Sequence, residues 1–343
     1  MKSIKLSIII SLVLVLLSSC SNKPKFIKGV VLSDLTNPHE IISDDKHLII
    51  SDGIEGTTIY IYSLENFSLF SKFGGTGESR DKFIVSQGHE VNMDIRNDKL
   101  LISSHWKTSF FNKSGDFEKE FSIKNDTYGY LFLEDKYIGE DDTTLNDIMY
   151  YTFNLYDKQF KFVKEITRIA GSNQGANGLQ VLVRKSQGII YENKYFIKGK
   201  SEEFEIESYD SNGNIIDTIS QNYNRIPVEE KHMNSVYKMY KDHPLFGQFF
   251  DAIKKRIIFP EYLPAIYNIN IANNFIYALT YETDGVYSLL YKLDLNGKLI
   301  DKLNVPLKWN GDTETYPFTI SNNKLYQLVM TKSEKWELQI IQL

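Results

Sequence analysis

Two dipeptides of identical composition stand out as residues that could do chemistry. His39-Glu40 and His89-Glu90 each place an imidazole beside a carboxylate. Such a pair can exchange a proton near neutral pH or ligate a metal ion. A calcium ion would need several oxygen ligands. The side chains available nearby are Glu40, Glu90, Asn92 and Asp94. Neighbouring residues of a regular strand point to opposite faces, so both members of one dipeptide can face the same cavity only if the strand is distorted.

Two tryptophans are candidates for surface binding. Trp106 follows His105, and Trp309 lies between Lys308 and Asn310, both at positions that we predict to be loops. Exposed aromatic rings stack on sugars or anchor protein partners. Large aromatic side chains more often pack in the interior, so packing between sheets is the alternative for both residues.

The elements that position these residues come from a repeat. A polar pair, usually Asn or Asp with Lys, precedes an apolar strand six times. Asn and Asp tolerate the left-handed backbone of a tight turn, and the apolar residues that follow suit a buried strand. The six copies begin at Asp45, Asp98, Asp135, Asn193, Asn274 and Asn323.

A short hairpin follows five of these strands. Its clearest copy runs from Phe111 to Phe121, with Ser114-Gly115 at the turn and apolar residues closing both arms. Three further copies cover 156–166, 209–219 and 293–303, and a fifth, 62–73, carries one extra residue. Strand, turn, strand, turn, strand at intervals of roughly 40–55 residues is the blade period of a β-propeller.

The fold class that we predict is all-β: a six-bladed β-propeller over residues 26–343. The sixth strand copy is followed by one more strand, Trp336–Gln342, while Phe26–Leu32 is an apolar strand without an assigned partner. We expect this first strand to pair beside Trp336–Gln342 and close the ring, which removes an exposed sheet edge. The alternative is a β-sandwich or two smaller all-β domains, in which six ordered copies of one turn-strand pattern are rare.

The longest interval between copies contains an insertion, 227–257, with helical periodicity. Its two apolar stripes are Met233, Val236, Tyr237, Tyr240 and, after His243-Pro244, Phe246, Phe249, Phe250, Ile253. Pro227 suits the first turn of a helix. We expect two short amphipathic helices on one face of the ring. They would either pack on the ring through these stripes or form a lid or docking surface over the central pocket.

The N-terminus predicts export and lipid attachment. A basic start precedes an apolar run from Leu6 to Leu17, which is shorter than a membrane span and typical of a signal peptide, 1–19. Leu17-Ser18-Ser19-Cys20 resembles a bacterial lipobox, which implies cleavage before Cys20 and acylation of that residue. Cys20 is also the only cysteine, so no disulfide can form within the chain. Residues 20–25 would then be a lipidated tether.

The residues after Cys20 and the net charge indicate where the protein is located and which partners are not expected. We expect the protein at the cell envelope, anchored through Cys20 in the outer membrane and facing the periplasm. Ser21 is not the aspartate linked to inner-membrane retention in some bacteria, and no acidic run linked to surface export follows it. Of 39 basic residues, loss of Lys2 and Lys5 leaves 37 against 44 acidic ones, without a basic patch. Nucleic acid is therefore not an expected partner, and we expect a monomer.

Two segments resemble known propellers. Phe73–Phe83 resembles the Gly-rich connection between blades of NHL-type propellers, with Gly171–Ala176 as a degenerate second copy. Ile258–Ile266, followed by Ile276–Thr280, resembles the six-bladed, TolB-like propeller lipoproteins of Bacteroidota. This resemblance implies an anchored propeller without an assigned reaction.

The sequence leaves two functions open. The first is a non-catalytic binding or scaffolding lipoprotein for an envelope protein or a glycan, without a cofactor. The second is a metal-dependent hydrolase or lactonase with a divalent cation in the central channel, held by the two His-Glu pairs. We favour the first, because the sequence contains no His-Glu-x-x-His, Gly-x-Ser-x-Gly, Walker loop or dinucleotide-binding fingerprint.

Overall fold

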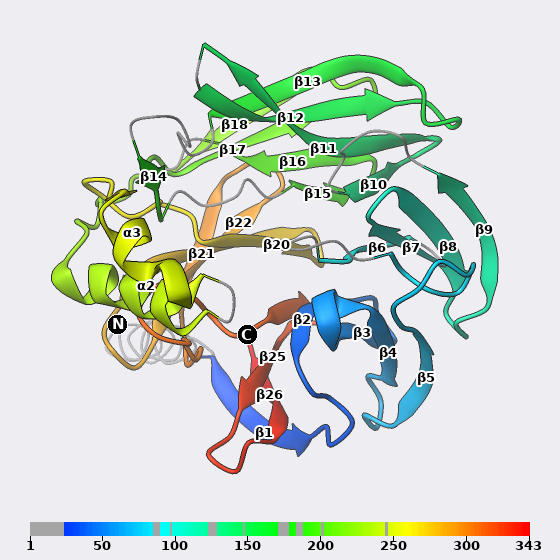
Figure 1. Ribbon diagram of the computed structural model, residues 1–343, viewed down its shortest axis with the longest axis horizontal. Coiled ribbons are helices and arrows are strands. Elements are labelled where there is room, and N and C mark those ends of the chain that lie inside the picture. Colours follow the sequence, from blue (N-terminus) through cyan, green and yellow to red (C-terminus); the bar gives the residue numbers. More distant parts are fainter. Residues whose placement is uncertain are drawn as a thin grey trace, which may run out of the picture.

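The computed structural model describes residues 24–84, 90–96, 98–122, 129–146, 148–170, 178–182, 188–199, 202–243 and 246–343. Within them the chain forms six four-stranded sheets, which Figure 1 shows arranged in a ring. The predicted six-bladed β-propeller is confirmed. The signal peptide, Cys20 and His89 lie outside the described residues.

Each blade runs in chain order from an inner to an outer strand, except that β1 completes blade 6. Blade 1 is β2 (Pro38–Ser43), β3 (His47–Asp52), β4 (Thr58–Ser63) and β5 (Leu69–Gly74). Blade 2 is β6 (Asn92–Arg96), β7 (Lys99–Ser104), β8 (Lys107–Asn112) and β9 (Phe117–Ser122). Blade 3 is β10 (Gly129–Leu133), β11 (Lys136–Leu145), β12 (Ile148–Tyr156) and β13 (Phe162–Ala170).

The second half of the ring repeats this order. Blade 4 is β15 (Gly188–Tyr191), β16 (Lys194–Lys198), β17 (Glu205–Tyr209) and β18 (Ile215–Ser220). Blade 5 is β20 (Asn268–Ala272), β21 (Phe275–Thr283), β22 (Ser288–Asp294) and β23 (Leu299–Val305). Blade 6 is β24 (Phe318–Ser321), β25 (Lys324–Met330), β26 (Trp336–Gln342) and β1 (Lys25–Val31).

The ring closes through β1, as predicted. This strand pairs antiparallel with β26, with Phe26 opposite Ile341 and Val31 opposite Glu337. Blade 6 therefore joins strands from both ends of the described chain. On its other edge, β26 pairs with β25, whose Leu325 and Leu328 are fully buried.

The six repeated turn-strand copies form the first turn and the second strand of each blade. The second strands are largely buried, and Leu48, Ile49 and Ile50 of β3 have no exposed surface. At the turn before β21, Asn273 and Asn274 have φ of 52° and 64°. These left-handed values are the conformation that made Asn informative in the sequence.

The antiparallel order gives the ring two different ends. One end carries the turns between first and second strands and between third and fourth strands; we call it the turn face. The other carries the connections between second and third strands and between blades; we call it the loop face. Leu343 donates its N–H to the carbonyl of Asn323 at 3.0 Å, which places the end of β26 on the turn face. Because β1 starts opposite Gln342, Lys25 also lies on the turn face.

The insertion forms two short helices, as predicted, on the loop face. These are α2 (Glu230–Asp242) and α3 (Phe250–Lys254), with a 3-10 turn, η2 (Gly247–Phe249), between them. The strand β19 (Ile257–Ile258), directly after the helices, pairs in parallel with β14 (Leu179–Gln180), which lies between blades 3 and 4. Another 3-10 turn, η1 (Ile54–Gly56), lies in blade 1. Among the described residues, no helix is both long and apolar enough to cross a membrane.

Two details of the insertion differ from the prediction. Pro227 is not in the first turn of α2, because Glu229 precedes the helix and donates its N–H to His232 Nδ1 at 2.9 Å, while Pro227 forms a bridge with Tyr262. Only the first apolar stripe packs closely: Val236 is buried, whereas Phe246 and Phe249 are 45% and 57% exposed.

Candidate functional site: the central channel

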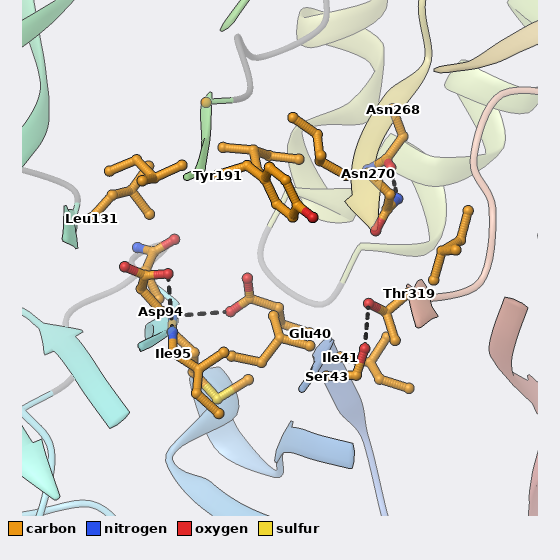
Figure 2. A pocket seen from close by; sticks show the side chains of 18 of the residues that line it. Glu40, Ile41, Ser43, Asp94, Ile95, Leu131, Tyr191, Asn268, Asn270 and Thr319 are labelled. Carbon is orange, nitrogen blue, oxygen red and sulfur yellow. Dashed lines mark hydrogen bonds between the residues drawn. The ribbon is translucent and has the colours of Figure 1, made fainter. Parts of the chain in front are cut away.

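A cavity of about 990 Å³ lies at the centre of the ring. Residues from all six inner strands line it, and Figure 2 shows their side chains converging from β2, β6 and β20. The described channel candidates all line the cavity: His39 and Glu40 are on β2, and Glu90 is in the segment before β6. The lining contains none of the described residues of α2, η2 or α3.

The loop-face mouth of the channel holds the His-Glu residues. His39 Nδ1 lies 3.0 Å from Glu90 Oε1, and His39 Nε2 lies 2.8 Å from the carbonyl oxygen of Gly53. The pairing of β2 with β3 shifts register between Pro38 and Glu40. The pairing is thus irregular at His39, and both His39 and Glu40 line the channel.

The His39-Glu90 contact raises the pKa of the imidazole. The hydrogen bond to Glu90 is the largest cause of this shift, and burial opposes it. His39 Nε2 also lies 3.0 Å from Asn37 Nδ2, so both ring nitrogens have polar neighbours. The pair therefore joins blade 1 to the segment that leads into blade 2.

Two inner-strand carboxylates link consecutive blades in the same way. Glu40 Oε2 accepts the N–H of Met93 at 3.1 Å, from blade 1 to blade 2. Asp94 Oδ2 accepts the N–H of Phe132 at 2.7 Å, from blade 2 to blade 3. Burial raises the pKa of Asp94 to about 6, although its backbone hydrogen bonds and Arg96 act in the opposite direction. These acids hold neighbouring blades together as well as lining the channel.

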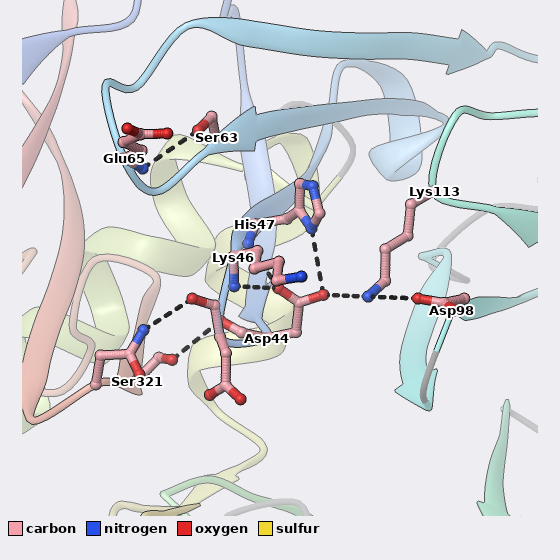
Figure 3. A network of polar contacts seen from close by, with 10 residues as sticks. Asp44, Lys46, His47, Ser63, Glu65, Asp98, Lys113 and Ser321 are labelled. Atoms are coloured by element: carbon pink, nitrogen blue, oxygen red, sulfur yellow. Dashed lines mark hydrogen bonds and ion pairs between the residues drawn. The ribbon is translucent and has the colours of Figure 1, made fainter.

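Asp44 anchors a polar network on the turn face, which Figure 3 shows. Its Oδ2 lies 2.5 Å from Lys113 Nζ of the blade 2 hairpin, and its carbonyl accepts the hydroxyl of Ser321 from blade 6 at 3.0 Å. Burial raises the pKa of Asp44, but Lys113 and the N–H groups of Lys46 and His47 lower it further, so that the net shift is downward. This network joins blades 6, 1 and 2.

The described lining is strongly acidic. It contains one lysine, Lys198, whose ammonium donates to the carbonyl of Tyr267 at 3.3 Å. The seven carboxylates of the lining are Glu40, Asp44, Asp45, Glu90, Asp94, Glu140 and Glu314. A narrow cavity between protein walls concentrates such a field, so the channel favours cations.

An amide pair on β20 also faces the channel (Figure 2). Asn270 donates from Nδ2 to Asn268 Oδ1 at 2.6 Å. Neither residue was predicted as a site residue from the sequence. Their i, i+2 spacing shortly before the fifth strand copy is nevertheless the pattern of residues on one face of a strand. Amide side chains offer both donors and acceptors to a polar ligand.

The two candidate tryptophans have different environments. Trp106 is 56% exposed at the turn between β7 and β8, with its ring beside His105. Trp309 is partly buried, donates from Nε1 to Ser288 Oγ at 2.8 Å and packs on Tyr267 and Tyr281. Both positions are on the loop face. Trp309 supports the channel wall, since Tyr267 lines the channel.

Some of the residues that the alternative function would use to bind a metal ion line the channel. Glu40, Glu90, Asn92 and Asp94 all line the channel, while His89 lies outside the described residues. The described part of the chain contains no group of three or more His, Cys, Asp or Glu side chains placed to hold a metal ion.

Comparisons with known proteins support the architecture. No family model matches the sequence, and no curated protein matches it. A solved member of the DUF4221 family from Bacteroides vulgatus has a TM-score of 0.52 and 11% identity over 94% of this chain and 98% of that chain. The Cps50 (Swd1) β-propeller domain from Myceliophteria thermophila has a TM-score of 0.46 and 9% identity over 93% and 99%. BamB from Moraxella catarrhalis has a TM-score of 0.38 and 10% identity over 93% and 98%. At such identities, the DUF4221 likeness shows a shared fold and nothing finer.

Proposed function

We propose that this chain is a non-catalytic binding propeller, held at the cell envelope by acylated Cys20, whose central channel takes a positively charged segment of another envelope protein. The observation that carries the proposal is the excess of carboxylates over lysine in the described lining. The lipobox-like Leu17–Cys20 supplies the argument for the anchor.

The described lining contains more acidic than basic side chains, and some of the acids have basic partners. Asp44 contacts Lys113 and Glu90 contacts His39. The lining holds seven carboxylates and one lysine, Lys198. The carboxyl of Asp94 contributes its charge above about pH 6. A lysine or arginine side chain entering the channel would replace water by charge-assisted hydrogen bonds.

A basic peptide fits the described lining better than a neutral glycan does. A neutral sugar gains hydrogen bonds from Asn268 and Asn270 but nothing from the net charge. A peptide with basic side chains uses both, because its backbone also pairs with amides. The cavity of about 990 Å³ has room for several side chains and not for a folded partner.

The enzyme alternative receives no support from these contacts. Glu40 and Asp94 accept backbone N–H groups of the next blade. Such bonds give the two carboxylates a structural role that a binding propeller needs as much as an enzyme does. We therefore rank binding above metal-dependent hydrolysis.

The test is the affinity of a lysine-rich peptide for the unacylated chain 21–343, which contains every strand of the six blades. We expect tighter binding of this peptide than of its lysine-acetylated form, and a weaker affinity at higher salt. Glu314→Gln, in the channel lining, should weaken binding several-fold, whereas the matched change Glu118→Gln on the outer strand of blade 2 should not. Equal affinity for both peptides, or tighter binding of a neutral oligosaccharide, would contradict the proposal.

The anchor has its own experiment. Cys20→Ala in the full chain should abolish labelling by a fatty-acid analogue and shift the protein out of the membrane fraction. Ser21→Ala is the control and should leave both properties unchanged. Undiminished labelling of Cys20→Ala would show that the lipid, if present, is attached elsewhere.

A further inference from the structure

The outer strands carry an exposed apolar pair at the same position in five of the six blades. In β5, β13, β18 and β23 the pair opens the strand, and in β1 it follows Lys25. All ten side chains are between 38% and 57% exposed. The pairs are Phe26-Ile27, Leu69-Phe70, Phe162-Val163, Ile215-Ile216 and Leu299-Ile300, which we call the apolar collar.

The position of the collar is the same in each blade because the topology is the same. The outer strands β5, β13, β18 and β23 start at the turn that joins each to its third strand, and β1 starts opposite the end of β26; both positions lie on the turn face. Farther along, the outer strands become polar, as in Ser71-Lys72 of β5 and Asp301-Lys302 of β23. Blade 2 has Phe117-Glu118 at this position. The five pairs therefore lie together at the turn-face end of the outer strands, whereas the other exposed large apolar residues of the described chain, such as Val286 and Phe249, lie toward the loop face.

Such surface is costly on an outer strand. Edge strands normally carry charges that keep them in water and prevent pairing with other chains. Single exposed apolar residues need no explanation, whereas a recurring set at one end of a molecule indicates a contact.

The tether enters the molecule through the collar. Lys25 opens β1 on the turn face, directly before Phe26-Ile27, and it follows Cys20 by only five residues. Five residues span at most about 18 Å when fully extended. Acyl chains on Cys20 would therefore hold the turn face close to the bilayer surface.

We infer that the apolar collar rests in the headgroup region of the membrane and orients the ring, with the turn face toward the bilayer. The inferred orientation at the membrane rests on the proposed anchor at Cys20. The affinity of the collar for lipid can be measured without that anchor. The loop face, with the insertion, Trp106 and the His39-Glu90 mouth, then points away from the membrane toward a partner. Because the contact is apolar, it needs neither anionic lipid nor low salt.

The experiment is flotation of the unacylated chain 21–343 with phosphatidylcholine vesicles. We expect measurable partitioning that changes less than twofold with added anionic lipid or salt. Replacing two pairs by serine, Ile215→Ser with Ile216→Ser and Leu299→Ser with Ile300→Ser, should reduce the partition coefficient at least tenfold. The exposed positions make these changes compatible with folding, which circular dichroism and the melting temperature would verify.

The matched control replaces four exposed apolar residues at the other end of the ring. Met239, Phe246 and Phe249 of the insertion are 48%, 45% and 57% exposed, and Val286, between β21 and β22, is 67% exposed. Changing these four residues to serine should leave partitioning unchanged. The inference is overturned if these control variants bind as weakly as the collar variants, or if wild type does not float at all. It is equally overturned if the collar instead forms a dimer, seen in sedimentation and lost in the collar variants.

Failure of this inference and failure of the anchor are separable. Fatty-acid labelling of the full chain reports on Cys20 and is independent of vesicle binding by chain 21–343. Labelling without flotation rejects the collar and keeps the anchor, whereas flotation without labelling keeps the collar and rejects the anchor.

Discussion

At the scale of single residues, Asp94 tests how far the channel wall removes its carboxylates from water. Burial raises its pKa to about 6, whereas an unfolded aspartate titrates near 4. Because the folded pKa is the higher one, stability present below about pH 4 is lost as the pH rises through about 6. Asp94→Asn cannot ionise, so we expect a free energy of unfolding about 1–3 kcal/mol above wild type at pH 8 and close to wild type at pH 4. Urea unfolding at both pH values measures this.

A matched control for Asp94 lies on an outer strand. Asp301 Oδ1 accepts the N–H of Lys302 at 2.8 Å, just as Asp94 Oδ1 accepts the N–H of Ile95 at 2.9 Å. Asp301 is exposed, so Asp301→Asn should not change the dependence of stability on pH between 4 and 8. A full wild-type pH dependence in Asp94→Asn would show that another group causes it.

Residue types alone identified part of the channel. His39, Glu40 and Glu90 are visible in the sequence because the same His-Glu dipeptide occurs before two of the repeated strands. The irregular pairing at His39 depends on the register of β2 against β3, which no local pattern reveals. Asn268 and Asn270 were missed for a related reason: amides are common in turns, and only the assembled blade shows which side of β20 faces the axis.

At the scale of elements, Gly74 tests the close packing of the Gly-rich connection after β5. Its φ is +92°, and an added Cβ would lie 2.5 Å from the carbonyl oxygen of Thr57 and 2.6 Å from the ring of Phe83. Gly285 has a similar φ of +89° with nothing within 4 Å. Backbone strain should cost about 1–2 kcal/mol in both alanine variants. Gly74→Ala adds the clash, for a total of about 3–5 kcal/mol.

Chemical denaturation of the two glycine variants separates these contributions. The difference between Gly74→Ala and Gly285→Ala measures the clash, since the left-handed backbone is common to both. Equal losses of stability would mean that Thr57 and Phe83 move aside. The connection would then be important for its backbone conformation alone.

Elements with local signals were predicted well, and those set by their neighbours were not. The turn at Asn273-Asn274 could be predicted because the residue type matches the left-handed backbone. The start of α2 could not, because Pro227 fits a first turn in general but is held by a bridge to Tyr262 in this fold. Likewise, helical spacing predicted the stripe of Phe246 and Phe249 but could not show that no sheet covers it.

At the scale of the whole molecule, ring closure follows from the sequence more readily than the two faces do. Six copies of one strand pattern and an unpaired strand at Phe26–Leu32 are enough to predict a closed ring. The collar is invisible in the linear sequence, because five separate apolar pairs become one feature only when the outer strands stand side by side around an axis. The curvature of the ring and the order of its strands, which are global properties, determine that the five pairs lie at the same end.

The closing strand is the last prediction at this scale. β1 has one neighbouring strand, β26, so separation of this pair is the simplest way to open the ring. Val31 and Glu337 are directly opposite in the register, at the Cα separation that a disulfide requires. In chain 21–343, which lacks Cys20, Val31→Cys with Glu337→Cys would close a loop of roughly three hundred residues and add up to about 5 kcal/mol by the chain-entropy model.

The comparison that decides whether ring opening limits stability is a second crosslink within one blade. Leu289 and Asn304 are also opposite in register, on β22 and β23, but they close a loop of only about fifteen residues, for which the same model gives about 3 kcal/mol. We expect the Val31–Glu337 crosslink to raise the melting temperature more than the Leu289–Asn304 crosslink, and reduction to reverse both gains. Equal stabilisation by the crosslink within blade 5 would contradict this prediction. Separation of β1 from β26 would then not be the step at which the ring opens, because a disulfide between these strands would stabilise the protein no more than one within a single blade.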